Sequence, residues 1–400
     1  MVRAARAIAP QDIPAEVIEK VKIGLLDLLS CVYESKPLPW GRQAIQLGDV
    51  AFTTAVLGHG LVREDMHTGS VSHLGVVIYP TLIALAEKHT VSGLDFIRAA
   101  ACGYEAGAAI GRALVSEEFV QLHRPTGTTG PIGAALAGAL LLGLTEDETV
   151  SAIGLAANTA SGLNEWPYSG ADDMFFHPGF AARNAVTAVQ LAQLGARGSE
   201  TALDGRAGLF ASLHQTAPDL TLFRDDRWEI LDVYYKPFAA CNYAQTASQA
   251  AAALAPIPAQ EIAQVHIKCS AAAVAYPGCD YTGPFDRILQ EKMSIQHCVA
   301  SALGDARLAA LTTLEASDEF TAAYPQKQGA EVMVTLRNGE KRSRKMNDLI
   351  PATEEQIRAR FRAVCPNAAE VERFVNQLET QTVGWPMLAA AAFQAAHQTF

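Results

Sequence analysis

The chain has 400 residues, which is more than one hydrophobic core usually accommodates, so we expect two domains. Half of the residues are apolar and 18% are charged, which suffices for a well-buried interior. The formal net charge of −11 argues against a nucleic-acid-binding groove and against docking on an anionic membrane surface.

The sequence shows no sign of export or of membrane insertion. Arg3 and Arg6 are followed by Pro10 and Asp12 rather than by an apolar run, so we expect no signal peptide. The most apolar stretch, residues 131–144, is shorter than the about 20 residues that span a bilayer. The seven cysteines are scattered and form no C-x-x-C pair, which predicts free, buried thiols. We therefore expect a cytoplasmic protein.

Helix signals dominate the first 256 residues. Residues 14–33 place apolar side chains three and four positions apart, which predicts an amphipathic helix with one buried face. The Ala/Gly-rich segments 98–115 and 131–144 predict helices that pack closely through small residues. Thr145 followed by Glu148 is a capping box and predicts the start of a further helix.

Strand signals appear only after residue 256. Residues 264–270 alternate between apolar and polar, and residues 332–336 alternate ahead of Asn338-Gly339, a hairpin-turn dipeptide. We therefore predict a mostly α protein, in which a large all-helical domain is joined to a smaller α+β lid domain. The predicted domains are residues 1–256 with about 377–400 for the helical one and residues 257–376 for the smaller one.

Histidines, acids and glycines concentrate in four short segments of otherwise apolar sequence. An imidazole supplies a base or an acid near neutral pH, and a nearby carboxylate fixes its tautomer. Asp65 lies two positions before His67, so the two side chains could be adjacent in a loop; for each histidine, a packing role is the alternative. The four segments are 58–75 with His59, Asp65, His67 and His73, 121–144 with His123, 174–186 with His177, and 235–245.

Two of these segments suggest helix starts. Residues 126–130 (TGTTG) lie just before a long apolar stretch, where free N–H groups and hydroxyls make an anion site, although a tightly packed helix entry is equally consistent. No lysine follows, so this is not a phosphate loop. His177 precedes Pro178, a favoured first-turn residue, and would stay neutral at the positive end of that helix; a capping histidine is the alternative.

Taken together, these segments resemble the MmgE/PrpD family, which includes 2-methylcitrate dehydratase, cis-aconitate decarboxylase and iminodisuccinate epimerase. The likeness runs from about Ile13 to Gly208. Its best-matching parts are YPTLIALAEKHTVSGLDFIRAAACGYE, HRPTGTTGPIGAALAGALLLGLTEDE and HPGFAARNAVTAVQLAQLGARG. The resemblance implies a helical domain with an α+β lid, a homodimer, and no metal or organic cofactor.

The resemblance also implies site residues. His73 matches the family histidine after an Asp-rich loop, His123 matches the histidine of an H-P-T-x-x-G segment, and Asp65 matches an acid of a D-x-D-D motif. With His67 these are the expected catalytic residues. The residues expected to contact the substrate are Arg124, Thr126, Thr128, Tyr168, His177 and Gln245.

Four positions depart from the family pattern and indicate a divergent member. Val62 replaces an acid, Met66 a threonine, Met174 a lysine and Gln245 a histidine. These changes remove a cation, an acid and a possible base from the expected site. The residues that we expect to supply replacement contacts are His67, Tyr168, Asp172 and Asp173.

The leading hypothesis is a cofactor-independent lyase or isomerase that abstracts a proton next to a carboxylate of a small carboxylic acid. His73 or His123 would be the base and the other the acid, with Asp65 orienting a histidine; each such group contributes roughly 10²–10⁴-fold. One alternative is a catalytically inactive binding protein on the same fold. Another is a metal-dependent hydrolase that uses the same histidines, although no H-E-x-x-H spacing occurs.

Overall fold

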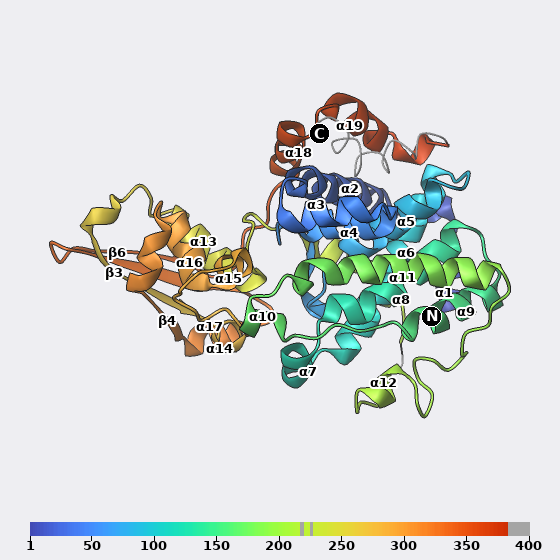
Figure 1. The fold of residues 1–400 in the computed structure, drawn as a ribbon, viewed down its shortest axis with the longest axis horizontal. Coiled ribbons are helices and arrows are strands. Elements are labelled where there is room, and N and C mark those ends of the chain that lie inside the picture. The colour runs from blue at the N-terminus through green and yellow to red at the C-terminus, as the bar shows by residue number, and fades with distance from the viewer. Residues whose placement is uncertain (217–219, 225–226, 383–400) are drawn as a thin grey trace. The chain divides into compact units, whose positions relative to one another are not determined.

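The computed structural model describes residues 1–216, 220–224 and 227–382, which belong to two compact units (Figure 1). The first unit contains Met1–Asn164, Asp173–Tyr235 and the segment that begins at Thr353, and the second contains Glu165–Asp172 and Lys236–Ala352. Residues 236–256 thus belong with the second unit and residues 353–376 with the first, which differs from the boundaries expected from the sequence. The apolar stretch 384–396 lies outside the described residues.

The first unit is built from helices. In chain order they are α1 (Val2–Ala7), α2 (Ala15–Ser35), α3 (Pro39–Leu47), α4 (Val50–His59), α5 (Gly75–Ala86), α6 (Gly93–Leu114), α7 (Glu117–Leu122), α8 (Pro125–Leu141), α9 (Glu146–Ala157), α11 (Asp173–Gln193), α12 (Leu209–Ser212), α18 (Glu354–Val364) and α19 (Ala368–Asn376). Two short strands, β1 (Met66–His67) and β2 (Val233–Tyr234), pair antiparallel within it. The helix expected over 14–33 is confirmed as α2, and the capping box of Thr145 and Glu148 is confirmed at the start of α9.

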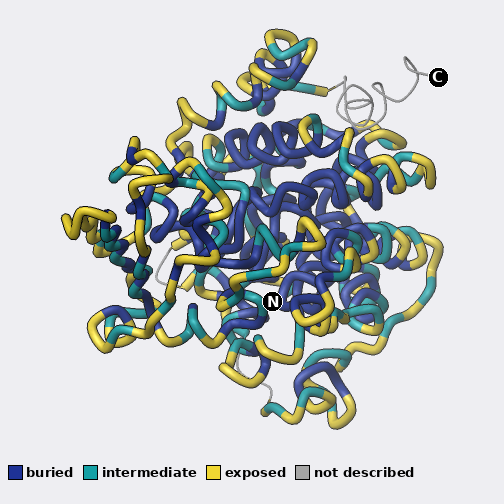
Figure 2. Tube along the Cα trace, turned by 60° about the vertical axis from the view of Figure 1, so that its left-hand side comes forward, coloured by how far each residue is buried: buried dark blue, intermediate teal, exposed yellow. Residues whose placement is uncertain are grey.

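Helix α8 lies at the centre of this unit and packs against α5, α6, α9 and α11. Small residues make the α6–α8 approach possible: a Cβ atom on Gly103 would lie 2.9 Å from the Cβ of Ala137, and one on Gly133 would lie 2.6 Å from the carbonyl oxygen of Gly103. The predicted packing through glycine and alanine is therefore confirmed. Buried residues follow one another along whole helices, shown in dark blue in Figure 2, so the core extends through the helical layers.

The second unit contains a four-stranded sheet with short helices. Its strands are β3 (Ile262–Cys269), β4 (Thr312–Ala316), β5 (Ala330–Leu336) and β6 (Lys341–Met346), in the order β4-β3-β5-β6. Strand β3 pairs parallel with β4 and antiparallel with β5, and β5 continues into β6 through a hairpin whose Gly339 has φ +88°. The helices are α10 (Trp166–Ser169), α13 (Gln245–Ala252), α14 (Ala271–Ala275), α15 (Ile288–Met293), α16 (Ile295–Ala302) and α17 (Asp318–Ala323).

This architecture confirms the predicted fold class, mostly α with a smaller α+β part. The strands expected at 264–270 and 332–336 are present as β3 and β5. Within the described ranges, no helix combines the length and the apolar character that crossing a bilayer requires.

Candidate active site

The loop between α4 and α5, residues 60–74, carries most of the candidate catalytic residues, and its backbone is strained. Val62 has φ +58° and Val71 has φ +50°. Side chains branched at Cβ rarely adopt a positive φ, and each such residue costs on the order of 1–3 kcal/mol. A strained backbone of this kind persists only where surrounding contacts fix it, so the loop is held in place by its neighbours.

Glu64 lies between two histidines that flank this loop. Its Oε1 atom is 2.6 Å from Nδ1 of His59, the last residue of α4, and 3.2 Å from Nδ1 of His73. All three side chains are buried. The second nitrogen of His59, Nε2, lies 2.9 Å from the sulfur atom of Met174. Both ring nitrogens of His59 thus contact protein atoms. These contacts suit a residue that positions the carboxylate of Glu64.

The contacts of His73 fix its tautomer. Its Nδ1 lies 2.7 Å from the carbonyl oxygen of Asp65 in addition to the contact with Glu64, and both partners are acceptors. Nδ1 therefore carries the proton, and the lone pair of the neutral ring is on Nε2. The backbone N–H of His73 donates to the hydroxyl of Thr126, at 2.9 Å. The ring that we expected to act as a base is held in the form that a base requires.

Asp65 contacts His73 through its backbone carbonyl. Its carboxylate accepts a hydrogen bond from the hydroxyl of Tyr104, at 2.5 Å, and a longer one from the N–H of Gly75, at 3.3 Å. That Asp65 orients a histidine in catalysis stays a prediction. The expected pairing of Asp65 with His67 is absent from the described contacts.

His177 is the third histidine of the cluster. Its ring centroid lies 5.1 Å from that of His59, which in turn lies 5.4 Å from that of His73. His177 lies in the second turn of α11, because the helix begins at Asp173 rather than at Pro178 as we expected. Pro178 lacks the N–H that would donate to the carbonyl oxygen of Met174 in a regular helix. Nδ1 of His177 donates to that oxygen instead, at 2.5 Å.

The charge state of His177 follows from its surroundings. Burial lowers the pKa of His177 well below its usual range, and the neighbouring His59 and Arg124 lower it further, so the ring is neutral at physiological pH. With the proton on Nδ1, the lone pair is on Nε2, and this solvent-inaccessible atom has no hydrogen-bond partner among the described residues. It is available to accept a hydrogen bond from a bound molecule.

The N-terminus of α8 lies against this cluster. A Cβ atom on Gly127 would lie 3.3 Å from Cδ2 of His177. Arg124 is the buried N-cap residue of α8, and its positive charge lowers the pKa of His177. The segment 126–130 lies inside the first turns of the helix rather than ahead of it. Its Thr128 hydroxyl donates to the carbonyl of Arg124, so the expected free hydroxyl is engaged in the helix.

His67 belongs to a different cluster. Its Nδ1 accepts the N–H of Ser70 at 3.1 Å, so its proton is on Nε2, which donates to Glu229 at 3.0 Å. Arg112 pairs with the same carboxylate. Burial raises the pKa of Glu229, but the contacts with His67 and Arg112 outweigh it and lower that pKa overall.

The atoms of His67, Glu229 and Asp232 lie close enough together to hold a metal ion, with ligand atoms within 4.8 Å of one another. The donor set does not favour a cation, because the guanidinium of Arg112 is paired with Glu229 and that of Arg227 with Asp232. The existing contacts of His67 indicate a structural role, as the residue that caps the short 3-10 helix Thr68–Ser70.

Three other predicted site residues lie apart from the histidine cluster in their described contacts. His123 ends α7, where its ring stacks on Phe119 with centroids 5.1 Å apart and its backbone bridges to Leu163. Tyr168 lies in α10 of the second unit and is exposed. Gln245 also lies in the second unit: its side-chain amide donates to the carbonyls of residues 238, 240 and 241, and its oxygen accepts the N–H of residue 238. It holds that loop together.

Two residues of the cluster were missed from the sequence. His59 lies in one of the four noted segments, and Glu64 is the neighbour of Asp65, yet neither was chosen as a site residue. Their five-residue separation across a helix end gives no periodic signal. Val62, between the two residues, has a positive φ, and beyond it the carboxylate of Glu64 reaches the ring of His59.

Comparison with known proteins shows what one part of the chain is similar to. Residues 45–220, the part that contains the whole histidine cluster, match the model of the MmgE/PrpD N-terminal domain. Over these residues the chain is similar to the MmgE/PrpD family.

Curated relatives are about 30% identical to the chain. A cis-aconitate decarboxylase-like protein from Aspergillus oryzae is 31% identical over 52% of the chain and 48% of its own length. Cis-aconitate decarboxylases from Aspergillus terreus and from Homo sapiens are 30% and 29% identical, over 52% and 45% of the chain and 48% and 38% of their own lengths. The chain thus spans about half the length, or less, of the curated relatives it matches.

Two of the four positions that depart from the expected family pattern, Met174 and Val62, lie in the cluster or next to it. Met174 contacts His59, and Val62 has the left-handed backbone that precedes Glu64. Met66 is buried in β1 beside His67. The thioether of Met174 brings no charge to the cluster.

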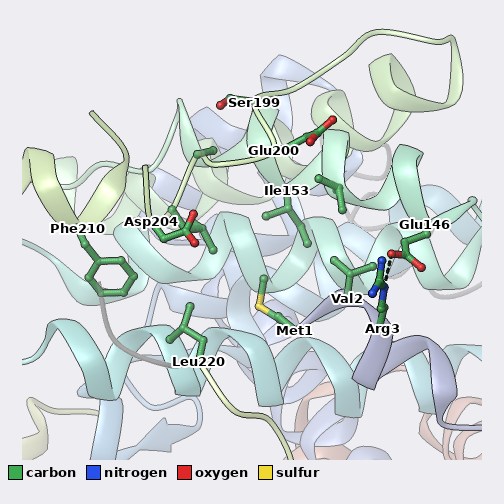
Figure 3. A pocket seen from close by; sticks show the side chains of 13 residues that line it. Met1, Val2, Arg3, Glu146, Ile153, Ser199, Glu200, Asp204, Phe210 and Leu220 are labelled. Atoms are coloured by element: carbon green, nitrogen blue, oxygen red, sulfur yellow. Dashed lines mark hydrogen bonds and ion pairs between the residues drawn. The ribbon is translucent and has the colours of Figure 1, made fainter. Parts of the chain in front are cut away.

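A separate cavity of about 590 Å³ lies in the first unit, between α1, α9 and the loop that follows α11 (Figure 3). Arg3 and Glu146 pair across one side of it at 2.7 Å, and Glu200 and Asp204 are acidic residues of its lining. None of its lining residues is a histidine, so its chemistry differs from that of the cluster around His73.

Proposed function

We propose that this protein is a lyase- or isomerase-type enzyme that transfers protons at a carbon next to a carboxylate of a small organic acid, without a cofactor. The observation that carries the proposal is the geometry of His73: its Nδ1 is held by the carbonyl of Asp65 and the carboxylate of Glu64, which leaves Nε2 as the basic atom. The buried imidazole of His59, the partly buried imidazole of His177 and the cation of Arg124 accompany it.

Each residue has a proposed role. His73 takes the proton from carbon through Nε2, and Glu64 stabilises the imidazolium that forms. Arg124 binds a carboxylate of the substrate, and the neutral ring of His177 accepts a hydrogen bond through Nε2. His123 stays the proposed general acid on the family resemblance.

The chemistry after proton removal decides the outcome. The electron pair released from the C–H bond moves toward the neighbouring carboxylate, where a cation and hydrogen bonds stabilise it. Departure of a group from the next carbon, with the pair forming the new double bond, gives a lyase, whereas return of a proton to carbon gives an isomerase or epimerase. The names of the relatives, cis-aconitate decarboxylases, favour a lyase. In a decarboxylation the departing carboxylate leaves its electron pair on carbon, and a protonated imidazole delivers the proton that replaces the lost carbon dioxide.

The experiment is proton NMR of the purified protein with a panel of di- and tricarboxylic acids that includes cis-aconitate. Loss of a substrate signal with a new olefin, loss of carbon dioxide, or isomer conversion supports the proposal. Binding without any conversion favours the inactive binding protein instead, and stoichiometric zinc, manganese or iron in the purified protein favours a metal-dependent hydrolase.

His123 is tested by replacement with alanine. We expect turnover to be abolished while the fold survives, as judged by circular dichroism. Near wild-type turnover would remove His123 from the mechanism and leave the cluster around His73 as the sole source of acid and base. A homodimer in the cytoplasm also stays a prediction, and light scattering of the eluted protein tests the dimer.

A further inference from the structure

Helix α2 carries a polar face inside a hydrophobic environment. Asp27, Ser30 and Glu34 are three, four and seven positions apart and lie on the same side of the helix. Asp27 and Ser30 are fully buried, amid neighbours on α2 that are mostly leucine and valine. Burying polar groups this way is unfavourable unless they have a partner, so a partner is expected on the facing element.

That partner is Arg63, which lies in the strained loop directly before Glu64. Its guanidinium donates to the carboxylate of Glu34 at 2.8 Å and to the hydroxyl of Ser30 at 3.1 Å. The arginine side chain is only 8% exposed and Ser30 is buried, so their hydrogen bond is shielded from water, whereas the side chain of Glu34 is 40% exposed. The two hydrogen bonds fasten the backbone of residues 62–65 to α2.

Asp27 is the third residue of this face and, unlike Ser30 and Glu34, accepts no hydrogen bond from Arg63 among the described contacts. Neither oxygen of its carboxyl group has a hydrogen-bond partner among the described residues. Burial raises the pKa of Asp27 to about 7, and the positive charge of Arg63 opposes that rise. The carboxyl is therefore neutral in mildly acidic solution and becomes an anion near Arg63 as the pH rises past neutrality.

We propose that Arg63 is a positioning residue for the proposed proton transfer, because its hydrogen bonds to Ser30 and Glu34 connect α2 to the loop that carries Glu64 and Asp65. We propose further that the buried carboxyl group of Asp27, on the same face of α2, modulates this role. The inference rests on the proposed function. Arg63 touches neither His73 nor His59 in the described contacts; it acts by holding the backbone from which Glu64 and the carbonyl of Asp65 reach His73.

The groups that face Asp27 come from every side of α2. They are Cys31 on α2 itself, Arg63, Glu64 and Asp65 in the loop, Tyr79 on α5, Tyr235 after β2, and Arg360 on α18. The two arginines favour the anion, whereas Glu64 and Asp65 disfavour it. Ionisation of Asp27 therefore changes the balance of charge felt by Glu64 and Asp65, the two residues that contact Nδ1 of His73.

The test uses the full-length protein labelled with ¹⁵N in histidine. Arg63→Met removes the clamp, Arg63→Lys keeps the charge but not the fork of donors, and Asp27→Asn removes the ionisation at constant shape. Arg98→Lys is the control, since Arg98 is a partly buried arginine of the same unit that donates to two backbone carbonyls. The readouts are the imidazole N–H signals, and kcat and KM across pH 5.5–8.5 with the acid that the panel identifies.

We expect Arg63→Met to move the Nδ1–H signal of His73 and to lower kcat by about 10²-fold with KM little changed, because misplacement by about 1 Å is that costly. Arg63→Lys should recover part of kcat, and Arg98→Lys should match the wild type. Asp27→Asn should match the wild type at pH 5.5 and depart from it above pH 7. If Arg63→Met does not fold, Arg63→Lys and Asp27→Asn decide the question by the same signals.

A folded Arg63→Met with wild-type histidine signals and wild-type kcat would overturn the inference, as would an Asp27→Asn variant with an unchanged pH profile. These failures are distinguishable from failure of the proposed function. If His73→Gln abolishes conversion while the Arg63 variants do not, the function stands and the positioning role is wrong. If no acid is converted, the N–H signals alone still decide whether Arg63 holds His73.

Discussion

At the scale of single residues, Asp27 shows how burial of one acid links stability to pH. Its pKa is raised from an ordinary 3.8 to about 7 in the folded chain. Below pH 4 the group is protonated in both states and has no effect. Between pH 4 and pH 7 the unfolded chain releases the proton while the folded chain keeps it, so stability falls as the pH rises and the loss is complete above pH 7.

Asp27→Asn should therefore stabilise the fold more at pH 8 than at pH 4.5. The difference between the two pKa values corresponds to at most about 4 kcal/mol at pH 8. Urea unfolding of the wild type and the variant at both pH values measures it, with the exposed Asp12→Asn as the control. An equal change in stability at the two pH values would show that Asp27 is ionised throughout.

Two threonines of α8 allow a matched comparison. The buried hydroxyl of Thr126 accepts the backbone N–H of His73, whereas that of Thr128 donates to a carbonyl of its own helix. Thr126→Val leaves a buried N–H unpaired, so we expect a loss of about 1–3 kcal/mol in unfolding free energy together with a lower kcat. Thr128→Val should change neither by much. Equal effects of the two replacements would mean that the contact with His73 is unimportant.

At the scale of elements, Gln245 organises the loop that precedes α13. Its side chain makes four hydrogen bonds to the backbone of residues 238–241, and it is fully buried. Gln245→Ala leaves those buried groups unpaired, so we expect a loss of about 2–4 kcal/mol in urea unfolding. Gln249 lies one turn later on the same helix and bonds only to Ile350 near the surface, so Gln249→Ala should lose less than about 1 kcal/mol. Similar losses in both variants would contradict a special role for Gln245.

Local patterns predicted the elements well, because their causes are local. The periodicity of residues 14–33, the capping box at Thr145 and the alternation before Asn338 each identified an element that is present. The sequence predicts that α11 starts near Pro178, because proline favours the first turn of a helix, whereas α11 begins at Asp173. The side chain of His177 binds the carbonyl oxygen of Met174 that Pro178 leaves without a backbone donor. Helix propensities do not describe such a side-chain replacement.

The candidate site was predicted only in part, because its contacts are not local. His73 and His177 were chosen from the sequence, but the cluster joins His59 to Met174 across 115 positions of the chain. The sequence suggests that His67 pairs with Asp65 two positions away, yet the two side chains bind different partners, Tyr104 for Asp65 and Glu229 for His67. Closeness in the sequence thus suggests a pairing of Asp65 with His67 that the described contacts lack, and it does not reveal the pairing of Glu64 with His59.

At the scale of the whole molecule, the chain joins a helical unit that contains every residue of the histidine cluster to a second unit built around a four-stranded sheet. The net charge of −11 coexists with buried cations at Arg63 and Arg124, so the overall charge does not describe the site. The family match covers residues 45–220 and thus the cluster, which is why the proposed chemistry is placed in the first unit.

The central claim is that His73 transfers the proton, and deuterium incorporation tests it most directly. The rate at which the carbon next to the carboxylate takes up deuterium in D₂O is followed by proton NMR for the wild type, His73→Gln and His67→Gln. We expect a fall of about 10²-fold or more for His73→Gln and a rate close to wild type for His67→Gln. Undiminished uptake in His73→Gln, or loss in His67→Gln alone, would contradict it.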